Sequence, residues 1–155
     1  MVDAVAIFPQ VGGACRMTVP MEYRQTQRDF DAFMIALRDR AMLQTTHQTY
    51  TMLDSVFRVF RARLTLQEFA RFADGLPPVL RALFVQDWDP AAERLSFGTA
   101  ADHAADVMKV RQDHNLSTPT AIQEVDETLK EHLGTERYAK LMAPLSPEAR
   151  QFWQG

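Results

Sequence analysis

The chain repeats part of its own sequence, without a gap, at an offset of 69 residues. The offset places Leu64 on Leu133. Four further identities follow in step: Ala70 with Ala139, Leu76 with Leu145, Pro78 with Pro147, and Arg81 with Arg150. Upstream, apolar residues fall on apolar residues: Leu53 on Ile122, Val56 on Val125, and Phe60 on Leu129. A unit of this length offers one apolar face that is too small to be stable alone, so the two copies are expected to pack together.

The spacing of apolar residues predicts helices in both copies. From Leu43 to Leu64 the apolar positions step by three and four residues, as they do on one face of an α-helix. Thr65 followed by Glu68 is a capping box, which predicts that a new helix starts at once. Gly134 is expected to break the helix of the second copy. No segment shows sustained alternation with a period of two, so no sheet is predicted.

These patterns predict an all-α fold. We expect a tandem duplication of a four-helix unit, packed into one compact helical bundle with an extended N-terminal arm. The predicted parts are the arm (1–20), a first helical unit (21–85), a connector (86–98) and a second helical unit (99–155). The arm is set apart because Pro9, Gly12 and Gly13 interrupt it and it lacks a helical period.

Charge and composition exclude several classes of partner. The 17 basic and 20 acidic residues are interspersed and give a net charge of −3, whereas nucleic-acid binding needs clustered lysine and arginine. No basic cluster suits a membrane surface, and no apolar run approaches the roughly 20 residues of a membrane span. The single cysteine, Cys15, excludes an intrachain disulfide and a multi-cysteine zinc site. We therefore expect a cytoplasmic protein with neither a nucleic-acid nor a membrane partner.

One segment carries a resemblance to a known family. It runs Leu76-Pro77-Pro78-Val79-Leu80-Arg81-Ala82-Leu83-Phe84 and is followed by Trp88-Asp89-Pro90. The pattern resembles the helical bacterial family catalogued as domain of unknown function 2267, and the resemblance extends over about residues 20–153. It implies a small, helical, duplicated fold. It implies no activity, cofactor or catalytic residue.

Histidine and aspartate in the second unit are the candidate metal ligands. His103 and Asp106 stand three residues apart on one predicted helix, a spacing that can present two ligands to one ion. His114 and His132 lie in the same half. A ferritin-like site would also need Glu-x-x-His pairs on separate helices, and the sequence has none. Asp106 is more simply an acid near a helix N-terminus, so we predict no metal and no cofactor.

Two arginines and two tryptophans are the candidate contacts. Arg81 and Arg150 occupy matched positions and could act as a pair of anion clamps. The interpretation we favour is that each arginine ties its short helix to a carboxylate of its own unit. Trp88, in the polar connector, either closes over the junction of the two units or contacts another protein, and packing is the favoured alternative. The same two alternatives apply to Trp153.

The sequence contains no Gly-x-Ser-x-Gly elbow, phosphate-binding loop or dinucleotide fingerprint. Our first functional hypothesis is therefore a non-catalytic interaction or regulatory module that binds a protein partner or itself, as a homodimer. The second is a carrier of a small or lipid-like molecule held between the two units. The third, least favoured, is a metal-dependent enzyme that uses His103, Asp106 and His114. The junction beside Trp88 and the connector is the predicted location of a site.

Overall fold

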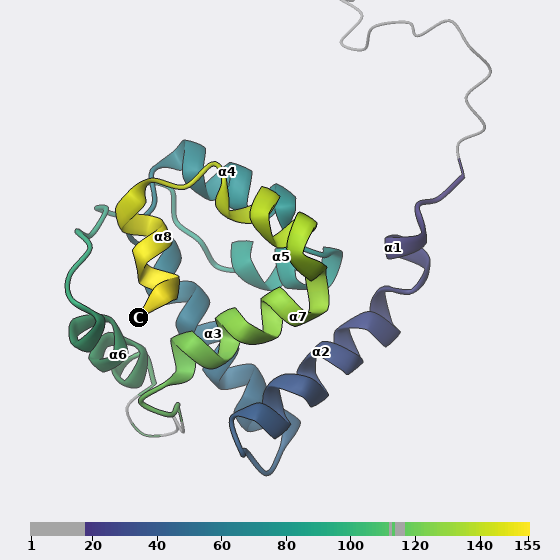
Figure 1. Cartoon of the computed structure of the whole chain (residues 1–155). Coiled ribbons are helices and arrows are strands. Elements are labelled where there is room, and N and C mark those ends of the chain that lie inside the picture. Colours follow the sequence, from purple (N-terminus) through teal and green to yellow (C-terminus); the bar gives the residue numbers. More distant parts are fainter. Residues whose placement is uncertain (1–17, 112, 114–116) are drawn as a thin grey trace, which may run out of the picture.

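The computed structural model describes residues 18–111, 113 and 117–155, and every regular element in those ranges is an α-helix (Figure 1). The helices are α1 (Met21–Arg24), α2 (Thr26–Arg40), α3 (Thr46–Arg61), α4 (Leu66–Gly75), α5 (Pro78–Val85), α6 (Ala100–Lys109), α7 (Ala121–Met142) and α8 (Pro147–Gln154). They pack into one compact body, which confirms the all-α fold class. Most of the predicted arm, residues 1–17, lies outside the described ranges, as does His114.

Local capping signals determine where several helices begin. Thr45, Thr65 and Thr99 each form a capping box at the start of α3, α4 and α6. The box predicted at Thr65 is confirmed: the Thr65 hydroxyl accepts from the Glu68 N–H at 3.2 Å, and the Glu68 carboxylate accepts from the Thr65 N–H at 2.9 Å. Prolines occupy the first turns of α5 and α8.

Helix α7 consists of two helical stretches joined at Gly134. The backbone of Gly134 has φ 76° and ψ 164°, a conformation that is open almost only to glycine. The predicted helix break is therefore present at this residue. The stretches on either side remain linked, because the Tyr138 hydroxyl after the break donates to the Asp126 carboxylate before it. Lys130, on the same side of the break as Asp126, pairs with that carboxylate at 2.5 Å.

The helix bounds correspond at the offset of 69 residues. Helix α2 ends at Arg40 and α6 ends at Lys109, while α5 and α8 begin at Pro78 and Pro147 and end at Val85 and Gln154. Paired positions are buried in both halves: Leu53 with Ile122, Val56 with Val125, Phe60 with Leu129, Leu76 with Leu145, and Phe84 with Trp153. This correspondence is what a duplication would produce. The duplication and the four-part division of the chain stay predictions.

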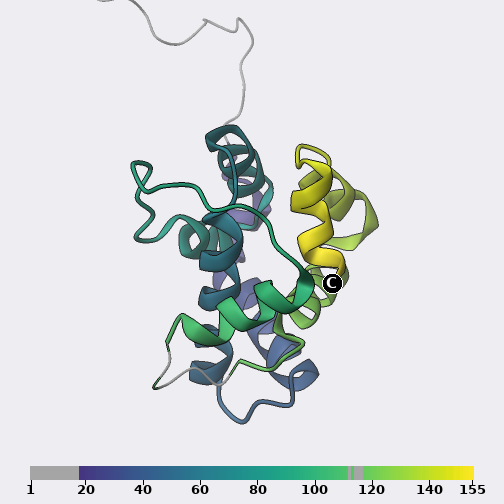
Figure 2. The same cartoon turned by 90° about the vertical axis from the view of Figure 1, so that its left-hand side faces the viewer.

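The two predicted units interlock instead of forming separate lobes. Helix α2 of the first unit packs on α7, and α6 of the second unit packs on α3, while α3 and α7 also contact each other. Figure 2 shows α6 crossing α3. At the repeat offset α2 corresponds to α6 and α3 to α7, so the two cross-contacts are equivalent. One core therefore serves both units.

Aromatic side chains from both units meet in that core. Phe60 on α3 lies 5.0 Å from Phe72 on α4, 4.9 Å from Phe152 and 4.8 Å from Trp153 on α8, measured between ring centroids. Trp153 is only 1% exposed. Burial of rings of this size contributes strongly to stability. None of the helices in the described ranges combines the length and the apolar character that a membrane span requires.

Candidate functional site

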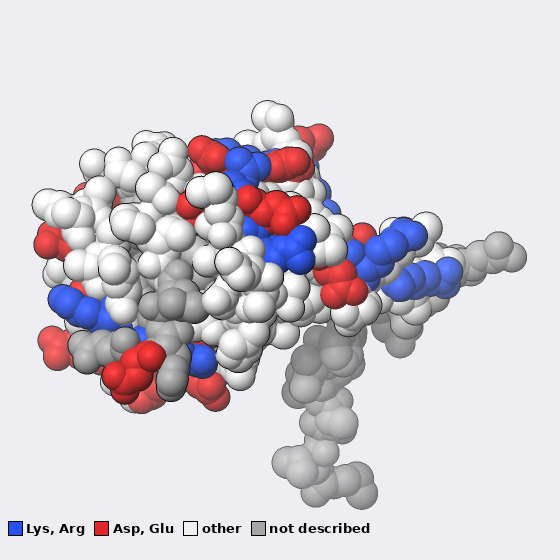
Figure 3. Space-filling view, turned by 90° about the horizontal axis from the view of Figure 1, so that it is seen from below, with Lys and Arg blue, Asp and Glu red and all other residues white. Residues whose placement is uncertain are grey.

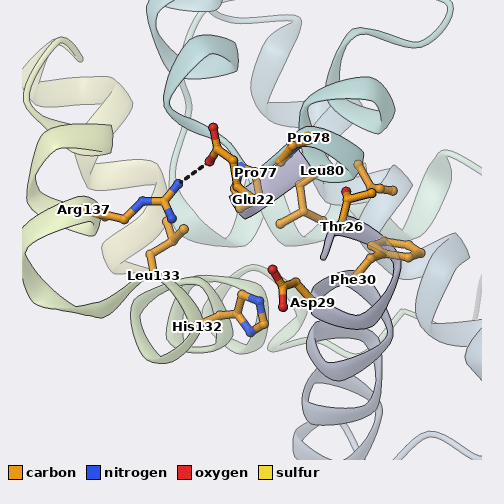
Figure 4. A pocket seen from close by; sticks show the side chains of 11 residues that line it. Glu22, Thr26, Asp29, Phe30, Pro77, Pro78, Leu80, His132, Leu133 and Arg137 are labelled. Atoms are coloured by element: carbon orange, nitrogen blue, oxygen red, sulfur yellow. Dashed lines mark hydrogen bonds and ion pairs between the residues drawn. The ribbon is translucent and has the colours of Figure 1, made fainter. Parts of the chain in front are cut away.

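A hollow of about 260 Å³ lies where α1, α2, α5 and α7 meet (Figure 4). Three of these helices belong to the predicted first unit and α7 belongs to the second, so the hollow lies on the junction between them. We call it the seam pocket. It is lined by Glu22, Thr26, Asp29, Phe30, Pro77, Pro78, Val79, Leu80, His132, Leu133 and Arg137.

Each wall of the seam pocket follows from local structure. Thr26, Asp29 and Phe30 are spaced by three and four residues, so they share one face of α2. The chain leaves α4 in an extended conformation, which places Pro77 and Pro78 at the pocket before α5 begins. Leu133 and Arg137 stand on either side of the glycine break in α7. The apolar part of the lining comes from the prolines, Phe30 and the leucines.

The ionisable residues of the seam pocket form one ion pair and leave one carboxylate without an ion pair among the described residues. The Arg137 guanidinium on α7 donates to the Glu22 carboxylate on α1 at 3.3 Å, and both side chains are partly exposed. In Figure 4 the Asp29 carboxylate points toward the His132 ring. Asp29 has no side-chain hydrogen bond or ion pair with any described residue, while the His132 ring stands edge-on to Phe33 at 5.6 Å. One carboxylate of this pocket, that of Asp29, is therefore not paired with any described cation.

A second hollow, of about 350 Å³, shares Glu22 and Arg137 with the seam pocket. We call it the basic hollow. Its lining consists of Glu22, Arg71, Asp74, Gly75, Arg81, Arg137, Lys140, Leu141 and Pro144. Four of these side chains are cationic and two are acidic, so the hollow carries an excess of positive charge on a chain whose net charge is negative. The Glu22–Arg137 ion pair stands at the boundary of the two hollows.

Arg81 and Arg150 differ in their surroundings although their sequence positions match. Arg81 donates to the backbone carbonyls of Ala73, Asp74 and Leu76, at 3.0, 2.9 and 3.1 Å, where α4 ends. A further N–H lies 3.5 Å from the Tyr23 hydroxyl. The main partners of Arg81 are thus helix-terminal carbonyls and not the carboxylate that we expected. Arg150 is exposed on α8, and its side chain has no hydrogen bond or ion pair with the residues that the structure describes.

Both tryptophans pack against aromatic rings. Trp88 stacks on Phe69 with a centroid separation of 3.7 Å and an interplanar angle of 16°, and Phe69 stacks in turn on Phe84 at 5.1 Å. Packing is the alternative that this geometry favours for Trp88. The connector is also fixed at its other end, where the Leu95 N–H donates to the Ala62 carbonyl at 2.9 Å. Trp153 lies in the core described above.

The candidate metal ligands are occupied by other interactions. His103 is buried, and its Nε2 accepts a hydrogen bond from the Gly98 N–H at 3.0 Å. Burial and, next, the Arg63 guanidinium lower the pKa of His103 below its ordinary value. Asp106 pairs with Arg63 at 2.6 Å. Across the described part of the chain, no cluster of three or more His, Cys, Asp or Glu could hold a metal ion.

The sequence predicted a site at the junction of the units, beside Trp88 and the connector. The seam pocket lies between α7 and helices of the predicted first unit, and neither Trp88 nor the connector lines it, so the predicted site stays a prediction. Sequence analysis did not single out Glu22, Asp29 or Arg137. Each looks like an ordinary charged surface residue in its own helix, and only the packing of α1, α2 and α7 brings them together. The Leu76–Phe84 segment supplies four of the lining residues, and two more residues named in the sequence analysis, His132 and Leu133, also line the pocket.

A family model with the description "Uncharacterized conserved protein (DUF2267)" matches residues 30–152, which is well over half of the chain. The matched range contains α3 to α7 and most of α2 and α8, whereas α1 and the first turn of α2 precede it. No curated protein matches the chain. The seam pocket thus combines matched residues with three residues upstream of the match: Glu22, Thr26 and Asp29.

Proposed function

The chain belongs to the DUF2267 family of uncharacterized conserved proteins, and we propose that it is a binding module that holds a small molecule in the seam pocket. The observation that carries the proposal is the convergence of four helices on one hollow, with an apolar wall and a few polar side chains. Ligand sites in proteins have this composition: mostly apolar, concave, and with few oriented polar groups.

The size of the seam pocket indicates the size of the ligand. Its volume of about 260 Å³ is just below the usual range of ligand pockets, which is roughly 300–1,000 Å³. A metabolite-sized molecule therefore suits it better than a large cofactor. Its position between helices is also favourable, because sites of helical bundles commonly lie between helices.

A protein partner or a second copy of the chain is the second candidate function. The observation in its favour is an apolar groove between α2 and α3, lined in part by Phe30, Met34, Ile35 and Tyr50. Ile35 is 47% exposed there, and Met21 on α1 is 64% exposed. Exposed apolar surface of this kind is typical of interaction sites. Light scattering at increasing protein concentration would separate a homodimer from a monomer.

The surface charge favours such partners over nucleic acid. On the face drawn in Figure 3, lysine and arginine lie next to aspartate and glutamate in mixed groups, with uncharged areas between them. A phosphate backbone attracts proteins through clustered positive charge. A small ligand or a protein partner places no such demand on this face.

A pocket-filling variant tests the proposal. Thr26→Phe places a ring on the α2 wall of the seam pocket, while Gln27→Phe places the same ring on the exposed neighbouring residue. Wild-type chain is screened against small apolar and amphiphilic molecules by ligand-observed NMR. We expect molecules that bind the wild type and Gln27→Phe but not Thr26→Phe. The proposal would be contradicted if both variants still bound these molecules, or if the wild type bound none of them.

A further inference from the structure

We infer that the ligand is a small amphiphile with an anionic head, whose apolar body lies in the seam pocket and whose carboxylate lies in the basic hollow. The inference rests on the proposed function, because it requires the seam pocket to be a ligand site. It goes further by naming the chemical class of the ligand and the residues that would recognise each end of it.

The first step is that the two hollows lie next to each other. They share Glu22 and Arg137, so a molecule that extends along this boundary can reach both. The Glu22–Arg137 contact, at 3.3 Å, joins two side chains that are 36% and 53% exposed. Exposed ion pairs of this kind are weak because water screens them. An anionic head can therefore replace Glu22 as the partner of Arg137.

The second step is the charge of the basic hollow. Arg71 is exposed, and its side chain has no hydrogen bond or ion pair with the described residues. Among the described residues Lys140 pairs with Glu136 alone, at 2.8 Å, and both side chains are more than 70% exposed, so this cation remains available to a ligand. Arg81 adds a third positive charge while its N–H groups bind carbonyls. The local excess of cations is complementary to a carboxylate.

The third step concerns the carboxylate of Asp29, which on its own would favour a cationic ligand. Asp29 lies in the first turn of α2, where the helix N-terminus stabilises negative charge. It also faces His132 across the pocket (Figure 4). The helix N-terminus therefore offsets part of its charge, although no described side chain pairs with it. The basic hollow has four cationic side chains against two acidic ones, so the head group is assigned to that side.

Three probes with the same chain length test the head group: octanoate, 1-octanol and octylamine. Their dissociation constants for the whole chain are measured by isothermal titration calorimetry. We expect octanoate to bind about tenfold more tightly than 1-octanol, as a charge-assisted hydrogen bond would provide, and octylamine to bind most weakly. Equal binding of octanoate and 1-octanol, or tighter binding of octylamine, would overturn the inference and leave the proposed function standing. If none of the three binds, both fail.

Variants locate the head group. The double variant Arg71→Gln with Lys140→Gln should weaken octanoate about tenfold and leave 1-octanol unchanged. The double variant Lys109→Gln with Arg150→Gln removes the same charge from α6 and α8 and is the matched control. Glu22→Gln should tighten octanoate, because it removes the competing carboxylate. An equal loss in the control would show that overall charge governs binding, and it would overturn the assignment to the basic hollow.

Discussion

Glu68 on α4 accepts a hydrogen bond from the backbone N–H of Ser146, at 2.9 Å and 78 residues along the chain. The other carboxylate oxygen of Glu68 accepts from the N–H and the hydroxyl of Thr65, each at 2.9 Å. A single side chain therefore closes the capping box of α4 and holds the residue that caps α8. It joins the two predicted units through backbone groups that would otherwise lack a partner.

We predict that this carboxylate contributes to stability in a pH-dependent way. Burial acts to raise the pKa of Glu68, but the hydrogen bonds from Thr65 and Ser146 together outweigh it and hold the pKa below its ordinary value of 4.5. Because the folded pKa is the lower one, the contribution is fully present above about pH 4.5. It is lost as the pH falls through the folded value.

Glu68→Gln tests this pH dependence. The variant should lower the free energy of unfolding at pH 7 by about 1–2 kcal/mol, as the loss of a helix cap does. It should lower it by less at pH 3, because the contribution of the carboxylate diminishes as the pH falls below 4.5. Urea titrations at both pH values measure the difference. Glu148→Gln, an exposed acid in the first turn of α8, is the control and should show a smaller difference. A deficit for Glu68→Gln that is equal at both pH values would contradict the prediction.

His103 also makes stability depend on pH. Unlike Glu68, which acts as a charged carboxylate, His103 is a base that the fold holds in its neutral form. The folded state favours the neutral imidazole, since burial and Arg63 lower the pKa below 6.5 and Nε2 accepts from Gly98. The unfolded chain binds the proton more readily, so stability should fall as the pH falls below about 6.5. His103→Leu should reduce this slope between pH 7 and pH 5. It should also cost about 1–3 kcal/mol at pH 7, because the Gly98 N–H loses its acceptor. An unchanged slope would count against this role.

Gly134 is predicted to be required for its backbone conformation and not for its small size. No described heavy atom lies within 4 Å of the position that a Cβ would take, but φ is 76° and ψ is 164°. Gly134→Ala should therefore lower the free energy of unfolding by about 1–3 kcal/mol through backbone strain alone. Gly134→Asn should not restore stability, because asparagine favours a different positive-φ region. Thermal unfolding of the two variants would show this, and a neutral Gly134→Ala would refute it.

Features that depend on neighbouring residues could be predicted from the sequence. The capping box of Thr65 with Glu68, the break at Gly134 and the proline-led start of α5 each involve residues within about four positions. The second contact of Glu68, with Ser146, could not be predicted, because it depends on how α4 and α8 pack. The same reason explains why Arg81 was given the wrong type of partner: no local pattern distinguishes a carboxylate from a helix-terminal carbonyl.

The candidate site was predictable only as a region. An apolar face on each unit requires a junction, and the seam pocket lies on it. Which charged residues reach that junction depends on the crossing of α1 and α2 with α7, and that crossing is a tertiary property. The aromatic contact of Trp88 follows the same rule, since Phe69 belongs to another helix.

The indole N–H of Trp153 is a hydrogen-bond donor buried in the core without an acceptor among the described residues. Among the described residues, its indole Nε1 is the one buried side-chain polar atom that lacks a hydrogen-bond partner. A buried donor without an acceptor costs about 1–3 kcal/mol, so Trp153→Phe removes a penalty as well as packing area. The repeat places Phe84 at the corresponding position, also fully buried.

We therefore expect Trp153→Phe to change the free energy of unfolding by less than about 1.5 kcal/mol, whereas Trp153→Ala should cost about 3–5 kcal/mol through the cavity that it leaves. Guanidinium titrations of both variants measure this, and a loss for Trp153→Phe as large as that for Trp153→Ala would mean that the indole N–H has a partner after all.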